Sequence, residues 1–347
     1  MGSQTGNSTE KDIEKTKGLS SYIQTAGYRR GLHLPDNVQE EYSLLGQGEY
    51  NRNYLFTHPV TGQKLVLRIN FGSQMHLAHQ IEYEYNALKL LEESGRTPRP
   101  FYVDGSLKDF TNGVMVMEYL PGHALDYHTE LFRAAGCLAD IHSVSLPKCT
   151  HLIVPENPVR AILEECEQMV CTYMESNLAD ADKKQKIRLL LDLAWKQADA
   201  LAAASYQCCI NTELNSTNFL MNGTEGPDYL IDWEKPICGE PAQDLGHFLA
   251  PTTTFWKTDV ILDEMEMRAF VEKYIEEVNG RFPVDDLWER TNTYMTVTCL
   301  RGITWCAMAW VEYQQPGREL VNESTWRKLE AYLTDEFLGK MKRFIEK

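Results

Sequence analysis

The strongest constraint on the fold is a change in the spacing of apolar residues at Leu120–Pro121–Gly122. Before this point, apolar and polar residues mostly alternate in short runs, as they do in half-buried strands. After it, apolar residues recur at spacings of three and four, which is typical of amphipathic helices. Because a Pro-Gly pair interrupts regular structure, the sequence predicts a small mixed region followed by a large helical one.

Before the break, three segments carry clear local signals. Residues 42–70 predict a hairpin around the turn Pro59–Gly62, and residues 101–119 predict strands joined by a turn at Asn112–Gly113. Between them, residues 76–95 predict one amphipathic helix that Gly95 closes.

After the break, helical patterns occupy residues 131–144, 161–177 and 186–204, and a strand-like YLIDWE precedes further helices. We therefore expect three regions. They are a polar tail with a short helix (residues 1–40), a small lobe (residues 41–119) and a mainly helical lobe (residues 120–347).

The composition is that of a folded globular protein. Of the 347 residues, 43% are hydrophobic and 24% are charged, which argues against disordered and fibrous classes. No apolar run reaches the ~18 residues of a membrane span, and the opening MGSQTGNSTEKD lacks the apolar core of a signal peptide. We expect a cytoplasmic protein with no membrane partner.

Charge and cysteine content restrict the partners further. The formal net charge of -16 disfavours nucleic acid, which requires clustered Lys and Arg, and weakly favours small cationic substrates. The nine cysteines include no CxxC pair. They indicate reduced thiols and neither a zinc site nor disulfides.

The segment CCINTELNSTNFLMN, residues 208–222, places a polar loop between two strand-like runs. Loops held by strands often carry catalytic groups, because the strands fix the loop and the loop exposes its side chains. The simpler interpretation of this segment is a hairpin rich in turn-forming residues.

Three phrases, VMEYLPG, CLADIHSV and LIDWEKPICGEPAQDLGHF, follow one another in an order that resembles the aminoglycoside phosphotransferase and choline kinase family. The resemblance covers about residues 42 to 310. It implies an α+β, protein-kinase-like bilobal fold, with an antiparallel sheet and one helix in the small lobe. It also implies ATP and Mg²⁺, with transfer of the terminal phosphoryl group of ATP to a hydroxyl of a small molecule.

Within this resemblance, LGQGEYNRNYLF matches the turn that covers the ATP phosphates. Gly46 and Gly48 would let backbone amides approach the phosphates, and Asn51 occupies the sixth position of an incomplete GxGxxG pattern. A glycine-bearing hairpin without a ligand is an equally simple interpretation. Backbone groups from Glu118 to Leu120 would contact the adenine at the hinge.

Arg68, in KLVLRIN, stands where protein kinases carry the strand lysine. The resemblance implies that it grips phosphate oxygens and pairs with Glu84 on the following helix, with Glu82 as the second candidate. The alternative is a surface ion pair worth at most ~1 kcal/mol.

The loop of residues 211–218 matches the catalytic loop HGDxxxxN of the family, with changes. Asn211 replaces histidine, Thr212 replaces glycine, and Glu213 replaces the catalytic aspartate. The resemblance makes Glu213 the base, and Asn218 and Asp232 the magnesium ligands.

Two further residues match structural positions of the family. Asp244 would hold the catalytic loop, and His142 is expected to be a buried, hydrogen-bonded helix residue. The acceptor site would lie in the helical lobe, with aromatic walls and acidic charge suited to an ammonium group; a helical core and a solvated acidic face explain the same residues more simply. The candidates are Trp256, Trp305, Trp310, Tyr313, Asp263, Glu264 and Glu266.

The sequence is consistent with two different functions. The first is an active ATP-dependent kinase acting on an amino alcohol, an aminoglycoside or a sugar-like compound. The second is a nucleotide-binding pseudokinase that serves as a regulatory or binding module, because two of the three signature side chains of the loop are altered.

Overall fold

The structure, a computed structural model, describes residues 13–198, 201, 203–314 and 322–346. The chain forms two compact units. Unit 1 comprises the chain up to His123 with Leu146–Leu152 and Leu220–Pro236, and unit 2 comprises the remainder. Residues 220–236, which the sequence analysis places in the second lobe, thus belong to the first. The expected tail and the expected helix at 186–204 lie partly outside the described residues.

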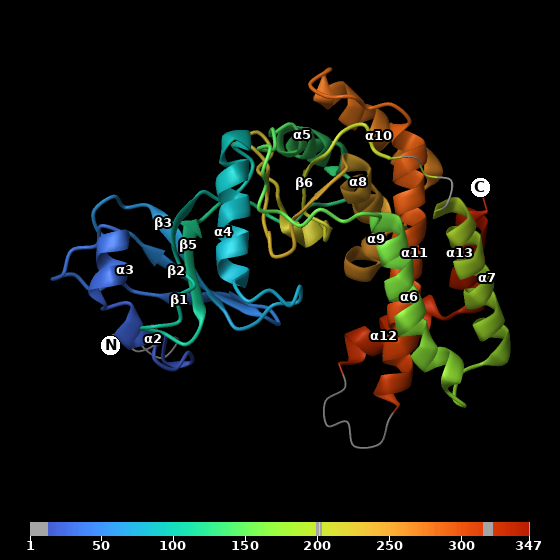
Figure 1. Cartoon of the computed structure of the whole chain (residues 1–347), viewed down its shortest axis with the longest axis horizontal. Helices are drawn as coiled ribbons and strands as arrows, with labels where there is room; N and C mark the ends of the chain where they lie inside the picture. The colour runs from blue at the N-terminus through green and yellow to red at the C-terminus, as the bar shows by residue number, and fades with distance from the viewer. Residues whose placement is uncertain (1–12, 199–200, 202, 315–321, 347) are drawn as a thin grey trace, which may run out of the picture. The chain divides into compact units, whose positions relative to one another are not determined.

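Unit 1 is built on a five-stranded antiparallel sheet in the order β1-β2-β3-β5-β4 (Figure 1). Its strands are β1 (Ser43–Gln47), β2 (Asn51–Thr57), β3 (Lys64–Asn70), β4 (Pro100–Asp104) and β5 (Gly113–Glu118). The central strand β3 is buried at every residue after Lys64. Both faces of the sheet are therefore covered.

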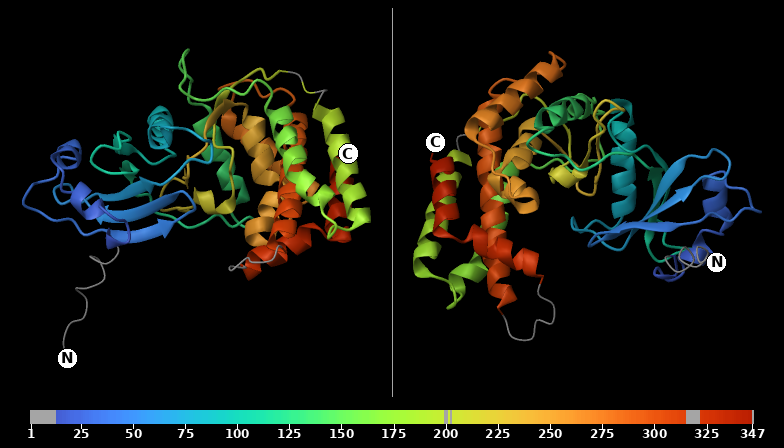
Figure 2. Two further views of the ribbon diagram at one scale, coloured as in Figure 1. Left: turned by 60° about the horizontal axis from the view of Figure 1, so that its bottom comes forward. Right: turned by 180° about the vertical axis from the view of Figure 1, so that it is seen from behind.

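Different helices cover the two faces (Figures 1 and 2). The short helices α2 (Leu19–Tyr22) and α3 (Ala26–Gly31) share a hydrophobic core with Leu65, Leu67 and Ile69. Because side chains alternate along a strand, Arg68 lies on the opposite face. That face packs against α4 (Gln80–Leu91), which contacts β4 and β5. Side chains between residues 13 and 34 are thus part of the core, whereas the sequence predicted a polar tail with a short helix.

The turns of unit 1 largely follow the sequence. The predicted turn joins β2 to β3, with Gly62 at a φ of 71°, and Gly95 ends the helical segment at a φ of 65°. The prediction of a turn at Asn112–Gly113 is wrong, because Gly113 is the first residue of β5. A Cβ at Gly113 would lie 2.7 Å from Ile81 Cγ2, so the close approach of α4 explains this glycine.

Unit 2 is mainly helical around the long helix α11, which packs against α6, α7, α8, α9 and α12. Its helices are α5 (Leu131–His142), α6 (Pro158–Glu175), α7 (Ala181–Ala198), α8 (Pro241–Leu249), α9 (Pro251–Thr258), α10 (Glu264–Val278), α11 (Leu287–Tyr313), α12 (Glu323–Tyr332) and α13 (Asp335–Ile345). The short strands β6 (Cys208–Ile210) and β9 (Ile237–Gly239) pair antiparallel, and β6 leads into the polar loop of residues 211–218. The 3₁₀ turn η2 (Ser216–Asn218) ends that loop. A second short ladder pairs β7 (Phe219–Leu220) with β8 (Tyr229–Leu230), and β8 belongs to unit 1.

An antiparallel sheet with one long helix on one face, followed in the sequence by a helical unit, confirms the predicted α+β, protein-kinase-like bilobal class. All nine cysteines are free, and only Cys149 and Cys171 are exposed. Among the described residues, no helix combines the length and the apolar character that crossing a membrane requires.

Candidate functional site

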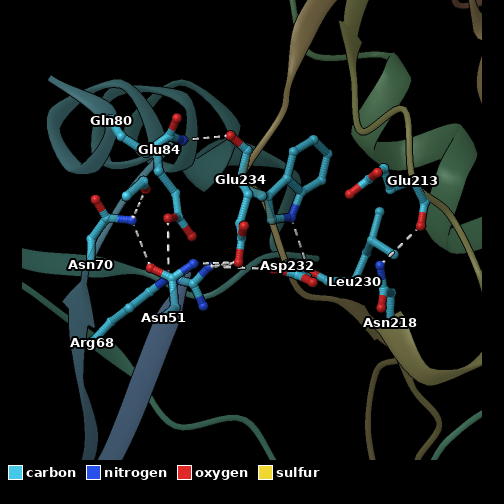
Figure 3. Close-up of polar contacts among 12 residues, drawn as sticks. Asn51, Arg68, Asn70, Gln80, Glu84, Glu213, Asn218, Leu230, Asp232 and Glu234 are labelled. Atoms are coloured by element: carbon cyan, nitrogen blue, oxygen red, sulfur yellow. Dashed lines mark hydrogen bonds and ion pairs between the residues drawn. The ribbon is translucent and has the colours of Figure 1, made fainter. Parts of the chain in front are cut away.

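Arg68 is the centre of a buried polar cluster in unit 1 (Figure 3). Its Nε donates to Glu84 Oε2 at 3.1 Å. Its Nη2 donates to Glu234 Oε1 at 2.7 Å and to Asp232 Oδ1 at 3.3 Å. The predicted pairing of Arg68 with Glu84 is present, whereas the second candidate, Glu82, pairs with His79 instead.

The low exposure of Arg68 and Glu84 distinguishes this cluster from a surface ion pair. Arg68 is 4% exposed and Glu84 is 1% exposed. Burial raises the pKa of Glu84 to about 7, against the opposing effect of Arg68, and Glu234 and Asp232 raise the pKa further. Three carboxylates thus share one guanidinium. Such a cluster favours the arrival of additional positive charge.

Glu234 is a residue that the sequence analysis missed. Besides Arg68, its carboxylate accepts a hydrogen bond from Asn51 Nδ2, and its backbone carbonyl accepts one from Gln80 Nε2 at 2.7 Å. Asn70 Nδ2 in turn donates to Asn51 Oδ1 at 2.9 Å. The available signal was the presence of two acids in Asp-Trp-Glu, two positions apart in the sequence.

Gly46 lies near the end of β1, Gly48 lies in the turn that follows, and Asn51 is the first residue of β2. The N–H of Gly48 donates to the carbonyl of Asn51 at 2.9 Å, which closes the turn. Within the described part of the chain, a Cβ at Gly46 would meet nothing within 4 Å, and one at Gly48 would meet only the Asn51 carbonyl. Packing inside the protein does not explain these two glycines.

The backbone groups at the end of β5 and directly after it are candidates for contact with a ligand. The N–H of Glu118 donates to the Arg99 carbonyl at 2.8 Å, and the N–H of Tyr119 donates to the Lys64 carbonyl at 3.2 Å. No hydrogen bond among the described residues takes the N–H of Leu120, which is 8% exposed. This N–H is a donor suited to a ligand.

In unit 2, one buried carboxylate shapes the polar loop. Asp244 is fully buried, and it accepts hydrogen bonds from the backbone N–H groups of Asn211 and Thr212, each at 2.8 Å. His142 Nε2 lies 3.2 Å from Asp244 Oδ2, and His142 Nδ1 lies 2.8 Å from Tyr274 Oη. The expected structural contacts of Asp244 and His142 are confirmed.

The loop is also bonded within itself. Asn211 Oδ1 accepts from the N–H of Glu213 at 3.2 Å, so this amide braces the loop where the family has histidine. The carbonyl of Glu213 accepts from Asn218 Nδ2 at 3.1 Å. This bond orients the amide of Asn218 and leaves its carbonyl oxygen available as a ligand.

Two candidate site residues have left-handed backbone conformations, Thr212 with a φ of 72° and Asp232 with a φ of 67°. A β-branched residue in this region is strained. Thr212 stands where the family has glycine, so the loop keeps a backbone shape that glycine adopts without cost. Strained residues of this kind cluster at functional sites.

The aromatic candidates for the acceptor site fall into two groups. Trp256 and Trp305 have ring centroids 5.5 Å apart, whereas Trp310 and Tyr313 each stack near Trp326. The acids are placed differently. Asp263 and Glu266 form the capping box of α10, a structural role that the sequence analysis did not consider.

Oxygen donors for a hard cation are present in both units. The Asp232 side chain is 45% exposed and so is accessible to a ligand. No group of three or more His, Cys, Asp or Glu side chains in the described residues is arranged to hold a metal alone. These donors therefore fit magnesium that arrives with phosphates, because Mg²⁺ is commonly held by one or two carboxylates plus substrate oxygens.

Comparison with known proteins identifies the class. The sequence model of the phosphotransferase enzyme family matches residues 41–280, and the chain belongs to this family. Its structure resembles spectinomycin phosphotransferase in complex with ADP and spectinomycin, with 15% identity and a TM-score of 0.59 over 88% of this chain and 93% of that one.

Two kinases from parasites are also similar in structure. A choline kinase from Cryptosporidium parvum gives 13% identity and a TM-score of 0.62, with 95% of each chain covered. An ethanolamine kinase from Plasmodium vivax gives 15% identity and a TM-score of 0.58, with 98% of this chain and 99% of that one covered. At these identities the likeness is one of fold.

Proposed function

We propose that the protein transfers the terminal phosphoryl group of ATP to a hydroxyl of a small molecule. The observation that carries the proposal is the buried Arg68, which receives carboxylates from α4 and from the Asp232–Glu234 segment. Phosphoryl transfer depends on cations placed against phosphate oxygens and on carboxylates that hold those cations and magnesium.

The nucleotide contacts are assigned to unit 1. Gly46 and Gly48 would bring backbone N–H groups to the phosphates, and Arg68 would bind phosphate oxygens with its guanidinium. Backbone groups of Glu118 and Leu120 would contact the adenine. The amide of Asn51 holds Glu234 beside Arg68, and Glu84 keeps the guanidinium oriented.

Magnesium would be held by Asp232 and Asn218, whose oxygens are the hard ligands that it prefers. When bound, it offsets the negative charge of the phosphates as transfer proceeds. Binding of this cation to Asp232 would also offset part of the excess negative charge around Arg68.

Glu213 is the proposed base. Its carboxylate would orient the acceptor hydroxyl and accept its proton, a contribution of typically ~10²- to 10⁴-fold. The acceptor classes are an amino alcohol, an aminoglycoside or a sugar-like compound. The formal net charge of -16 favours those that carry an ammonium group.

The test is a screen of ATP consumption against amino alcohols, aminoglycosides and sugars, with and without Mg²⁺. We expect consumption that needs both the metal and one class of acceptor. Binding of Mg-ATP without transfer to any acceptor would contradict the proposal and favour the pseudokinase alternative.

A further inference from the structure

A pocket with a volume of about 460 Å³ lies in unit 2, between α10, the N-terminal end of α11 and α13. This volume is within the range of small-molecule sites. None of the residues that line it belongs to the polar loop of residues 211–218. The pocket is therefore separate from the candidate catalytic residues of this unit.

The walls of the pocket combine an apolar floor with a cationic rim. Leu262, Met267 and Met341 are buried and supply the floor. Arg268, Lys340 and Arg343 are exposed and supply the rim. Three cations around one apolar cavity stand out in a chain with a formal net charge of -16.

Two of the three rim cations have no acidic partner among the described residues. In the described part of the chain, no carboxylate forms an ion pair with Lys340 or Arg343. Two acids also line the pocket: Asp263 Oδ1 accepts from the N–H of Glu266 at 2.8 Å, and Glu264 takes part in another interaction, so the three cations outnumber the two acids. The cations are thus available to an anion.

Trp288 provides a flat surface in the same pocket. The guanidinium carbon of Arg268 lies 4.7 Å from the centroid of the Trp288 ring, which is the distance of a cation–π contact. A guanidinium held against an indole presents both an aromatic face and hydrogen-bond donors. This combination suits a ligand that has an aromatic body and an acidic group.

We propose that this pocket is a second binding site, for an organic anion with an aromatic body. The aromatic part would lie on Trp288 and the apolar floor, and the carboxylate or sulfonate of the ligand would bind Arg343 and Lys340. The cationic acceptor proposed above does not fit a rim of three cations. The ligand of this pocket is therefore not that acceptor.

The test is a fluorescence titration of the full chain with 8-anilinonaphthalene-1-sulfonate, an aromatic sulfonate, with and without excess Mg-ATP. We expect saturable binding that Mg-ATP does not displace. Arg343→Glu should raise the Kd about 10-fold or more, because it removes a charge-assisted hydrogen bond and adds a repulsive charge.

Lys342→Glu is the matched control. It makes the same change of charge on the same helix, but Lys342 does not line the pocket and instead lies 3.6 Å from Glu346. We expect it to leave the Kd within about twofold, since exposed charges outside a site contribute little. Equal effects of the two variants, displacement by Mg-ATP, or binding that does not saturate would each overturn the proposal.

Trp288→Phe gives a second readout. It should lower the energy transfer from tryptophan to the bound probe, while circular dichroism shows an intact fold. Should Arg343→Glu fail to fold, Arg343→Gln removes the charge with a smaller change, and a Kd equal to that of the wild type would then count against the site.

Discussion

The Arg68 cluster of unit 1 and the polar loop of unit 2 are built in opposite ways. In the cluster, charged side chains contact one another directly, and Arg68 binds Glu84, Asp232 and Glu234. In the loop, backbone N–H groups bond to the side chains of Asp244 and Asn211. The cluster therefore depends on which side chains are present, and the loop depends mainly on its backbone shape.

This difference explains where the chain departs from the family pattern. In the predicted match to the family motif, Asn211, Thr212 and Glu213 take the places of histidine, glycine and aspartate, and the backbone N–H groups of Asn211 and Thr212 bond to Asp244. A replaced side chain there leaves those bonds in place. In the cluster, loss of Arg68 would leave the buried charge of Glu84 uncompensated, which costs about 3–5 kcal/mol.

The largest effect is expected from Asp232→Ala. It removes a proposed magnesium ligand, so turnover should fall by about 10³-fold or more, since such an ion supplies several kcal/mol of charge stabilisation. Arg68 keeps Glu84 and Glu234 as partners, so the fold should persist. The measurement is ATP turnover together with nucleotide affinity at several Mg²⁺ concentrations.

Asp109→Ala is the control, because Asp109 is an exposed aspartate of the same unit. It should leave both quantities unchanged. If Asp232→Ala binds ATP equally well with and without Mg²⁺ and matches the wild type, the assignment of Asp232 to the metal is wrong.

Substitutions of Glu213 test the proposed catalytic role of the loop, again through turnover and nucleotide affinity. Glu213→Gln should lose ~10²- to 10⁴-fold in turnover and keep nucleotide affinity, since it removes a base and no proposed nucleotide contact. Glu213→Asp restores the family residue with a shorter arm, and a displacement of about 1 Å can cost ~10²-fold. We expect reduced but measurable turnover for it. Robust transfer by Glu213→Gln would exclude Glu213 as the base.

The cluster should also respond to pH. In the folded state the pKa of Glu84 is raised from 4.5 to about 7. The folded state therefore holds this proton more tightly than the unfolded state does. The resulting stabilisation is complete below about pH 4.5 and is lost as the pH rises through about 7.

Urea unfolding of the wild type and Glu84→Gln at pH values from 5 to 8 checks this. The difference in unfolding free energy between the two should change by roughly 1–3 kcal/mol across that range, with the wild type losing stability relative to the variant as the pH rises. Glu93→Gln, at an exposed glutamate just after α4, should run parallel to the wild type. Parallel curves for Glu84→Gln would refute the raised pKa.

The sequence predicted the contact between neighbouring elements of the cluster but not the contact between distant segments. The periodicity of residues 76–95 placed Glu84 on a helix, and the alternation in KLVLRIN placed Arg68 on one face of a strand, so their pairing was predictable. The part played by Glu234 was not. It depends on a contact across more than 160 residues, with Arg68 Nη2, and no local pattern specifies such a contact.

The N-terminal segment shows the same limit. Residues 13–40 look polar in sequence, yet Tyr22 and Tyr28 are at most 1% exposed in the core. Tyrosines that satisfy each other, such as Tyr28 and Tyr42 with hydroxyl oxygens 3.0 Å apart, can be buried without charge. Composition cannot predict the burial of these tyrosines, because it counts polar residues without showing which of them hydrogen-bond to one another.

The smallest effect, and the most specific to the loop, is expected from Thr212→Gly. Thr212 has a φ of 72°, a conformation that costs a β-branched residue of order 1–3 kcal/mol, whereas glycine adopts it freely. Glycine also loses more chain entropy on folding, by about 0.5–1 kcal/mol, so the net gain should be about 1 kcal/mol. The bond from residue 212 to Asp244 uses the backbone N–H and survives the change.

Thr217→Gly is the matched control in the same loop. Thr217 does not have a positive φ, and its hydroxyl donates to Asn215 Oδ1 at 2.6 Å, so glycine there should destabilise the protein. Thermal and urea unfolding of the two variants should therefore shift in opposite directions. A loss of stability in both would mean that the Thr212 side chain contributes more than its backbone strain costs, and the loop would then depend on its side chains as the Arg68 cluster does.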